Sequence, residues 1–384
     1  MLPDQQFLRI PGPTPIPPSV QHAMNLPMIG HRDQETKDLL HSIKPKLKPV
    51  FGTNQEVLMI AGSGTAGLES AVVNAVQPGD EVLVIVTGAF GDRFAQICTE
   101  HQIATHRYDV KWGEAAEPEE IEKYLKSHPH IKAVFATLCE TSTGVLNPVK
   151  ELARVIRQHS DALFIVDGVS GVSGADVKMD EWEIDILITG SQKAMMLPPG
   201  LTFAAVSERA WKVIENNSRP SFYFDLAKYR DQLDNDSTPF TPALSLLFGL
   251  NQVLELMEQE GLEAVYSRHR QMMNMTRAAF KALDIPLLTS DESASPTVTA
   301  IKPDDFDPDA LRKVLKKEFN LTVAGGQKHL KGSIFRIGHM GYCSPADILQ
   351  TIGIIEVALN KIGKPAELGS GTRAAQEIML SGGS

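Results

Sequence analysis

The feature that most constrains this chain is a series of unbroken apolar runs between about Val57 and Ser207. Such runs are expected of strands buried on both faces of a parallel sheet, because a solvent-facing strand would alternate with polar residues. Helical stretches, for example Thr65–Val76 and Val149–Gln158, lie between several of them. The pattern predicts an α/β domain with a mostly parallel sheet and helices on both faces. The predicted strands are Val57–Ala61, Glu81–Val86, Lys132–Leu138, Leu163–Asp167, Asp185–Thr189 and Leu201–Val206.

The pattern of apolar residues changes after this region. Pro242–Gly261 predicts a long helix, and from Leu262 shorter helices and strands alternate, which is typical of a smaller α+β domain. At the N-terminal end of the chain, before the apolar runs, the prolines of Ile10–Pro18 exclude a helix interior and predict an extended segment. We therefore expect an N-terminal arm at 1–20, a large α/β domain at 21–261, a small α+β domain at 262–365 and a loose tail at 366–384. The small domain's predicted elements are strands Ser295–Ile301 and Ile334–Ile337 and helices Asp307–Phe319 and Pro345–Leu359.

Composition excludes several classes of function. The formal net charge of -10 and the lack of a basic run argue against a nucleic-acid partner. The longest apolar stretches are too short to span a bilayer, and the N-terminal residues do not resemble a secretory signal. The three cysteines, Cys98, Cys139 and Cys343, are far apart and show no metal-ligand spacing. We expect a cytoplasmic protein without a membrane partner, a metal or a disulfide framework.

Two charged residues end predicted strands. Lys193 follows the apolar run that ends near Thr189, and Asp167 ends the run Leu163–Asp167. Taken singly, such a lysine is most often a solvated loop residue and such an aspartate caps a turn. Together they suit pyridoxal 5'-phosphate (PLP), because a lysine can form a Schiff base with this cofactor while an aspartate pairs with its pyridinium nitrogen.

A glycine-rich turn, Gly62–Gly67, follows the first predicted strand and opens a helix. Its pattern matches the dinucleotide fingerprint, but the second strand lacks the acidic residue that would hold a ribose. The simpler interpretation is that Ser63, Gly64 and Thr65 hold a single phosphate at a helix N-terminus. A tight turn without a ligand is the alternative.

Three further residues could contact a ligand. Phe90 lies in a glycine-flanked loop after the second strand, where its ring could stack on a flat heterocycle or simply fill the core. Thr141 lies in the polar turn Glu140–Gly144 after the third strand, which could also be an ordinary helix cap. Arg336 stands on an apolar strand, where it could bind a carboxylate in bidentate fashion or form a structural ion pair. Because ligands of open α/β sheets bind outside the carboxyl ends of strands, we expect Phe90 and Thr141 to lie near Lys193.

These motifs resemble the class V (fold type I) PLP-dependent aminotransferases, in the alanine–glyoxylate and serine–pyruvate (serine–glyoxylate) group. The most specific match is Gly190–Ala194 followed by Pro198–Gly200. The matches run in family order over nearly the whole chain, and they imply a seven-stranded type of sheet. The other matching segments are Pro11–Thr14, Gly62–Thr65, Glu140–Val145, Val166–Ser170 and Arg336–Gly338.

The resemblance also implies a role for each site residue. Lys193 and Asp167 would be catalytic, and Arg336 would bind the substrate α-carboxylate. The family forms a homodimer in which a loop of the partner helps to bind the phosphate. Thr241 matches a family threonine of that loop, whereas Thr238 stands where some members have tyrosine. The cofactor-binding residues implied are Ser63, Gly64, Thr65 and Gln192 at the phosphate, Phe90 and Val169 on the two ring faces, Thr141 at the ring hydroxyl, Asp167, Lys193, Thr238 and Thr241.

The implied function is transfer of an amino group from alanine or serine to glyoxylate or pyruvate by a ping-pong mechanism. One alternative keeps the fold and cofactor but uses another donor: ureidoglycine, aspartate, phosphoserine or 2-aminoethylphosphonate. A second is a cysteine desulfurase-type lyase, which would need a cysteine on a mobile loop, and only Cys343 lies near Arg336. A third is an NAD-binding or scaffold protein, which the missing ribose acid disfavours.

Overall fold

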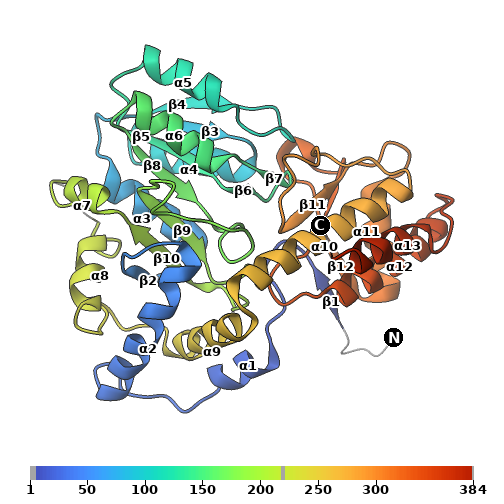
Figure 1. The fold of residues 1–384 in the computed structure, drawn as a ribbon, viewed down its shortest axis with the longest axis horizontal. Coiled ribbons are helices and arrows are strands. Elements are labelled where there is room, and N and C mark those ends of the chain that lie inside the picture. The colour runs from blue at the N-terminus through green and yellow to red at the C-terminus, as the bar shows by residue number, and fades with distance from the viewer. Residues whose placement is uncertain (1–5, 218–220, 383–384) are drawn as a thin grey trace.

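The computed structural model describes residues 6–217 and 221–382, which form two sheets with their helices (Figure 1). The larger sheet has seven strands in the order β2-β10-β9-β8-β5-β3-β4. Every residue of β5, β8 and β9 is buried, so both faces of the sheet are covered. Its strands are β2 (Val57–Gly62), β3 (Glu81–Val86), β4 (Ala104–Asp109), β5 (Ala133–Thr137), β8 (Leu163–Asp167), β9 (Ile186–Gly190) and β10 (Gly200–Val206).

The prediction of a mostly parallel sheet is confirmed. The pairs β3–β4, β3–β5, β5–β8 and β8–β9 are parallel, and only β10 runs antiparallel to its neighbours β2 and β9. The sequence pattern missed β4, because this edge strand is exposed or half-buried along its length and its residues are mostly polar. Charged residues on an edge strand hinder pairing with a second sheet.

The helices of the larger unit cover a core that extends from Val20 to Met257. They pack on the sheet and on one another, with α3 against β9 and β10 and α4 against β3. The helices are α1 (Pro18–Met24), α2 (Gln34–Phe51), α3 (Gly64–Ala75), α4 (Ala89–Glu100), α5 (Pro118–Ser127), α6 (Val149–His159), α7 (Glu208–Ile214), α8 (Leu226–Leu233) and α9 (Leu244–Glu260). A short hairpin, β6 (Cys139–Glu140) with β7 (Val145–Leu146), follows β5.

The smaller unit, on the right in Figure 1, contains a four-stranded sheet in the order β1-β12-β13-β11 and has its own core. The described part of the predicted arm begins as strand β1, which pairs in parallel with β12, while residues 1–5 lie outside the described residues. The predicted domain limits stay predictions. The elements are β1 (Phe7–Arg9), α10 (Leu262–Ala282), β11 (Val298–Ile301), α11 (Pro308–Phe319), β12 (Leu321–Gly325), the 3-10 turn η1 (Lys328–Leu330), β13 (Phe335–Gly338), α12 (Pro345–Lys361) and α13 (Ser370–Leu380).

The expectation of a loose C-terminal tail at 366–384 is wrong for the residues that the structure describes. Helix α13 occupies most of this segment and packs against α10 and α12, with Ala375 fully buried. Glu356 of α12 fixes its start by accepting hydrogen bonds from the backbone N–H groups of Gly369 and Thr372, both at 3.0 Å. The glycines and serines that flank the helix concealed its apolar face in the sequence.

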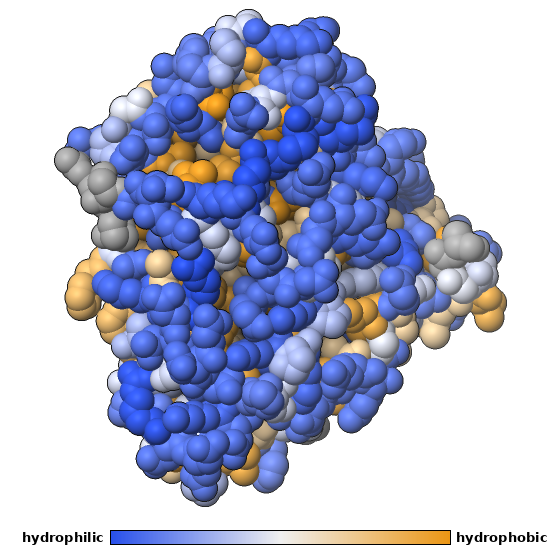
Figure 2. Space-filling model, turned by 60° about the vertical axis from the view of Figure 1, so that its left-hand side comes forward, coloured by the Kyte–Doolittle hydropathy of each residue, from blue (hydrophilic) through white to orange (hydrophobic). Residues whose placement is uncertain are grey.

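The surface is polar over most of the face shown in Figure 2, with hydrophobic residues gathered in a few places. In the part of the chain that the structure describes, no helix has the length and apolar character needed to cross a bilayer.

A buried carboxylate below the sheet offers a test of this packing. Asp185, just before β9, pairs with Arg157 at 2.8 Å and with Arg209, and it accepts a hydrogen bond from the backbone N–H of Phe164 at 2.7 Å. Burial raises the pKa of Asp185, but hydrogen bonding to Arg209 and the charges of both arginines outweigh burial and hold it below its usual range.

We expect Asp185→Asn to lower the free energy of unfolding by about 3 kcal/mol at pH 7, because it leaves two arginines without their carboxylate. The loss should shrink as the pH falls from the ordinary carboxyl pKa, where the unfolded chain begins to bind a proton, to the lowered pKa of Asp185, where the folded wild-type carboxylate also loses its charge. Urea unfolding followed by circular dichroism measures the effect. Asp176→Asn, at a half-exposed pair with Lys178, is the control and should change stability by less than about 0.5 kcal/mol.

Candidate active site

The carboxyl ends of the large sheet bring most of the predicted site residues to one edge. Asp167 is the last residue of β8, and Lys193 follows the end of β9. Because β2 and β9 both run antiparallel to β10, they run in the same direction, and the turn after β2 reaches the same edge. Phe90 and Thr141 follow β3 and β5.

Lys193 lies beneath the N-terminal arm. Its side chain is buried, and its ammonium donates a hydrogen bond to the carbonyl of Pro11. Nζ lies 5.9 Å from the centroid of the Phe90 ring. Thr14 anchors the arm by donating from Oγ1 to the carbonyl of Lys193 at 2.9 Å. Burial, reinforced by the charge of Arg336, lowers the pKa of Lys193 to about 8.

Asp167 is buried but keeps room for another partner. Its Oδ1 accepts a hydrogen bond from the backbone N–H of Val169 at 2.8 Å. Burial raises the pKa of Asp167 to about 6, and the nearby charge of Glu140 adds to the rise. A cation placed against this carboxylate would be stabilised by it and would lower that pKa.

The glycine-rich turn has the features of an anion site. Helix α3 begins at Gly64, and the side chain of Ser63 makes no capping hydrogen bond to it. Gly64 packs so closely on Val169 that a Cβ atom at Gly64 would lie 2.9 Å from Val169 Cγ2. The Oε1 atom of Gln192 is buried without a hydrogen-bond partner among the described residues, and the NH2 group of the same amide is the part of this side chain that could donate to an anion. Thr65 Oγ1 accepts a bond from Arg93 at 3.2 Å, which adds a positive charge to the turn.

Phe90 lies in the first turn of α4, and the expectation that it belongs to a loop is wrong. Its place is set by Glu140, whose Oε2 accepts hydrogen bonds from the backbone N–H groups of Phe90 and Gly91, both at 3.1 Å. Glu140 is fully buried, and burial raises its pKa. Nothing in the sequence pattern marks Glu140 for a role, because its partners are mostly backbone groups that leave no side-chain signal.

Arg336, on β13, connects the smaller sheet to this edge. Its guanidinium donates to the carbonyl of Gly325 from Nε at 2.9 Å and from Nη2 at 2.7 Å, and to the carbonyl of Thr141 from Nη1 at 2.8 Å. It forms no ion pair with any residue that the structure describes, so the structural ion pair considered as its alternative is absent from this part of the chain. Burial lowers the pKa of Arg336 to about 10, while the charge of Glu140 opposes the fall.

Thr238 and Thr241 lie in a different setting. They line a small cavity beside β2 with Ala61 and Tyr223. The hydroxyl of Thr238 donates to the carbonyl of Phe240 at 2.7 Å, and Thr241 is exposed. The described residues of one chain therefore show neither threonine bonded to the glycine-rich turn.

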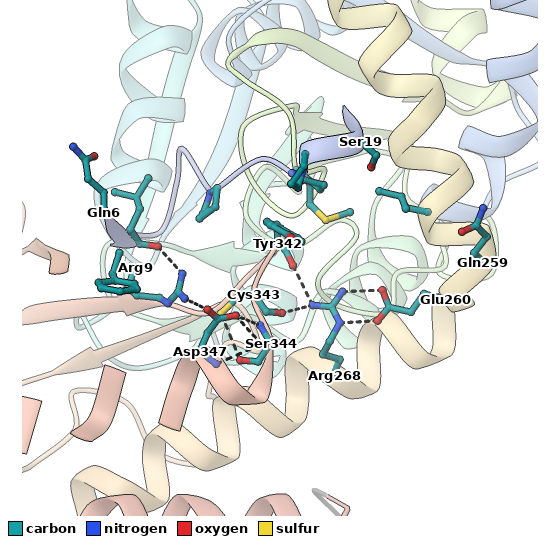
Figure 3. Close-up of a pocket in the computed structure, with 18 residues that line it drawn as sticks. Gln6, Arg9, Ser19, Gln259, Glu260, Arg268, Tyr342, Cys343, Ser344 and Asp347 are labelled. Atoms are coloured by element: carbon teal, nitrogen blue, oxygen red, sulfur yellow. Dashed lines mark hydrogen bonds and ion pairs between the residues drawn. The ribbon is translucent and has the colours of Figure 1, made fainter. Parts of the chain in front are cut away.

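The other side of the arm lines a cavity of about 840 Å³ (Figure 3). Its arginines are already paired: Arg9 with Asp347, and Arg268 with Glu260 at 2.6 Å. Neither Lys193 nor Asp167 lines this cavity, and the arm residues that contact Lys193, Pro11 and Thr14, do not line it either.

Comparison with known proteins identifies the fold and the family together. The family model described as aminotransferase class-V matches residues 10–344. The chain belongs to the class V aminotransferase family. The prediction from the motifs is confirmed at this level.

Among relatives of this aminotransferase, an uncharacterized aminotransferase of Methanocaldococcus jannaschii is 44% identical, over 98% of each chain. A Synechococcus protein named soluble hydrogenase, small subunit, is 41% identical over 98% of this chain and 99% of its own. The L-aspartate–glyoxylate aminotransferase of Paracoccus denitrificans is 35% identical over 97% of this chain and 96% of its own.

Solved structures confirm fold type I. Ureidoglycine–glyoxylate aminotransferase from Bacillus subtilis superposes with a TM-score of 0.92 at 31% identity, covering 99% of each chain. Pyridoxamine–pyruvate aminotransferase from Mesorhizobium loti gives a TM-score of 0.94 at 28% identity, covering 98% of this chain and 97% of its own.

Family and structural neighbours imply PLP as the cofactor, and the residues present fit it. The N-terminus of α3 has no side-chain cap, so its backbone N–H groups are available to donate to a phosphate. Phe90 and Val169 offer apolar surfaces for a ring, and Asp167 is a buried carboxylate without a cationic hydrogen-bond partner among the described side chains.

Gly12 provides a test of how closely the arm covers Lys193. Its φ is +103°, and a Cβ atom there would lie 2.5 Å from Lys193 Cδ. We expect Gly12→Ala to displace the lysine and to lower the turnover of the PLP-loaded enzyme by about a hundredfold or more. Loading is measured by visible absorption, and turnover by a keto-acid assay.

Gly79→Ala is a matched control, because φ is +101° there and nothing lies within 4 Å of the added Cβ. Both variants should lose about 1 to 3 kcal/mol of stability from backbone strain. Equal turnover in the two variants would contradict close packing of the arm on Lys193.

Proposed function

We propose that this aminotransferase moves an amino group from a small neutral amino acid, alanine or serine, to glyoxylate or pyruvate. The observation that carries the proposal is the burial of Lys193 and Asp167 at one sheet edge, together with an Arg336 guanidinium that forms no ion pair with a described carboxylate. Relatives named for aspartate, serine and ureidoglycine all have glyoxylate in their names, which favours glyoxylate as the acceptor.

Lys193 is the proposed attachment point of the cofactor and the proposed base. A buried amine with a pKa of about 8 is uncharged in a useful fraction of molecules near neutral pH. Its Nζ can therefore accept the proton from the donor Cα and release it later in the cycle. The arm over Lys193 excludes water from that proton transfer.

When bound, PLP supplies an aldehyde that takes up the donor's amino group and a ring that delocalises the electrons released at Cα. Asp167 would hold a proton at the ring nitrogen, because its carboxylate has only one backbone N–H as a hydrogen-bond donor. Phe90 and Val169 would hold the ring from its two faces, and Thr141 would contact the ring hydroxyl.

Phosphate and carboxylate would bind at separate places. Ser63, Gly64, Thr65 and Gln192 would hold the phosphate at the start of α3, where the helix dipole favours an anion. Arg336 would bind the substrate α-carboxylate, since three hydrogen bonds to carbonyls use three of its five N–H groups.

A homodimer would complete the phosphate site. In this arrangement Thr238 and Thr241 of the partner subunit would reach the phosphate, which would account for the lack of a hydrogen bond from either threonine to the glycine-rich turn within the described part of one chain. Exposed aromatic side chains near this loop, including Phe222 at 77% exposure, are suited to such an interface. We place the enzyme in the cytoplasm because all three cysteines are free.

The desulfurase alternative is disfavoured by Cys343. Its side chain is buried and packs in the core of the smaller unit. Burial raises the pKa of its thiol to about 11, whereas a nucleophilic cysteine needs an exposed thiolate.

The donor can be tested by visible absorption of the purified enzyme loaded with PLP. We expect a yellow band that bleaches when L-alanine or L-serine is added and returns with glyoxylate, because each half-reaction changes the cofactor. Lys193→Ala should lose this exchange, and aspartate and 2-aminoethylphosphonate are the comparison donors. Bleaching by either of these, but by neither alanine nor serine, would overturn the proposed donor class and leave the aminotransferase assignment intact.

Arg336→Lys tests carboxylate binding. We expect the KM for the donor to rise about tenfold or more, since losing one charge-assisted hydrogen bond costs roughly 1.5 to 3 kcal/mol. PLP loading should not change. Arg312→Lys, at an arginine of the same unit that pairs with Asp309, should leave the KM within about twofold. An unchanged KM in Arg336→Lys would rule out this role.

A further inference from the structure

Glu140 is a buried carboxylate that the roles above leave unused. It is 0% exposed, lies in β6 and forms no ion pair with a described residue. Its two oxygens accept hydrogen bonds from the backbone N–H groups of Phe90, Gly91 and Ser142 and from the Ser142 hydroxyl at 2.6 Å. So many donors stabilise an ionised carboxylate, although burial opposes it.

The same carboxylate is connected to Arg336 through one residue. Arg336 donates to the carbonyl of Thr141, the residue after Glu140, at 2.8 Å. The described residues provide Arg336 with carbonyl partners but no carboxylate within ion-pair distance. A buried guanidinium without a counter-charge is costly, and the charge of Glu140, the residue before Thr141, acts on Arg336 and stabilises its charged form.

We propose that Glu140 is a positioning residue with two actions: it fixes the backbone of Phe90 at the start of α4, and it supplies the counter-charge of Arg336 until a substrate carboxylate arrives. The proposal rests on the proposed carboxylate-binding role of Arg336. Its consequence is competition, because the fixed charge of Glu140 repels the carboxylate that Arg336 attracts. Glu140 thereby limits how tightly any carboxylate is held, which favours release of the keto-acid product.

The test measures binding of propionate, a carboxylate without an amino group, to the PLP-loaded enzyme by isothermal titration calorimetry. We expect Glu140→Gln to bind propionate on the order of tenfold more tightly than wild type, because a repelling charge is removed. A residue that only maintained structure would weaken binding or leave it unchanged when substituted. Unchanged or weaker binding in Glu140→Gln would therefore overturn the proposal.

Ser142→Ala is the matched control. It removes the strongest hydrogen bond to Glu140 but keeps the charge, so propionate affinity should stay within about twofold of wild type. If Ser142→Ala bound propionate as tightly as Glu140→Gln does, the gain in affinity would come from loosened packing around residue 140 and not from the loss of its charge. That result would overturn the proposed role of Glu140 as counter-charge of Arg336.

Visible circular dichroism of the bound cofactor tests the positioning of Phe90. Glu140→Asp keeps the charge but withdraws it by one methylene from α4, so the cofactor signal should weaken while propionate affinity stays within about twofold. This variant also serves if Glu140→Gln does not fold. An unchanged signal would overturn the positioning action, and tenfold tighter propionate binding would overturn the charge action.

Arg336→Gln distinguishes a failure of the proposed role of Glu140 from a failure of the proposed role of Arg336. Propionate binding should be lost in this variant, whether residue 140 is Glu or Gln. If Arg336→Gln still bound propionate, the carboxylate-binding role of Arg336 would be refuted. The proposed role of Glu140 would be refuted with it, because it depends on that role. If propionate binds wild type through Arg336 but does not respond to Glu140→Gln, only the role of Glu140 is refuted.

Discussion

The rest of this site depends on one constraint, which is that a lysine amine is kept away from water at the edge of a buried sheet. Burial gives Lys193 a pKa of about 8, so the amine can exchange a proton near neutral pH. The arm contacts the lysine on its covered side, through the Pro11 carbonyl and the Thr14 hydroxyl. The large sheet supplies a carboxylate, because β8 ends in Asp167 at this edge, and β13 of the smaller sheet brings Arg336 to the same edge.

Two buried carboxylates near this amine differ in how their oxygens are used. Asp167 accepts a hydrogen bond from the backbone N–H of Val169 and retains capacity for a cation. Glu140 is surrounded by donors from α4 and Ser142, and its geometry is therefore fixed. The difference lies in the hydrogen-bond partners and not in residue type. Asp167 can therefore still bind a cation, whereas Glu140 holds the surrounding backbone in place.

The sequence predicted the parts of the fold that have a strong periodic or motif signal. The apolar runs placed six of the seven strands of the large sheet within one residue or so at each end, and the motifs around Lys193 identified the family. It did not predict β4 or α13, because an exposed edge strand lacks an apolar run and flanking glycines concealed the apolar face of α13. It also assigned no role to Glu140, whose partners are mostly backbone N–H groups created only by the folded arrangement.

The pairing of β1 with β12 has a consequence for how the protein is made. Phe7 lies opposite Leu321, so the first described strand can be placed only after more than three hundred further residues have left the ribosome. The arm that covers Lys193 continues directly from β1, and contacts so distant in the chain form late. The strand that leads into the arm is thus anchored only in a nearly complete chain, and a product of translation that ended before β12 would lack this anchor.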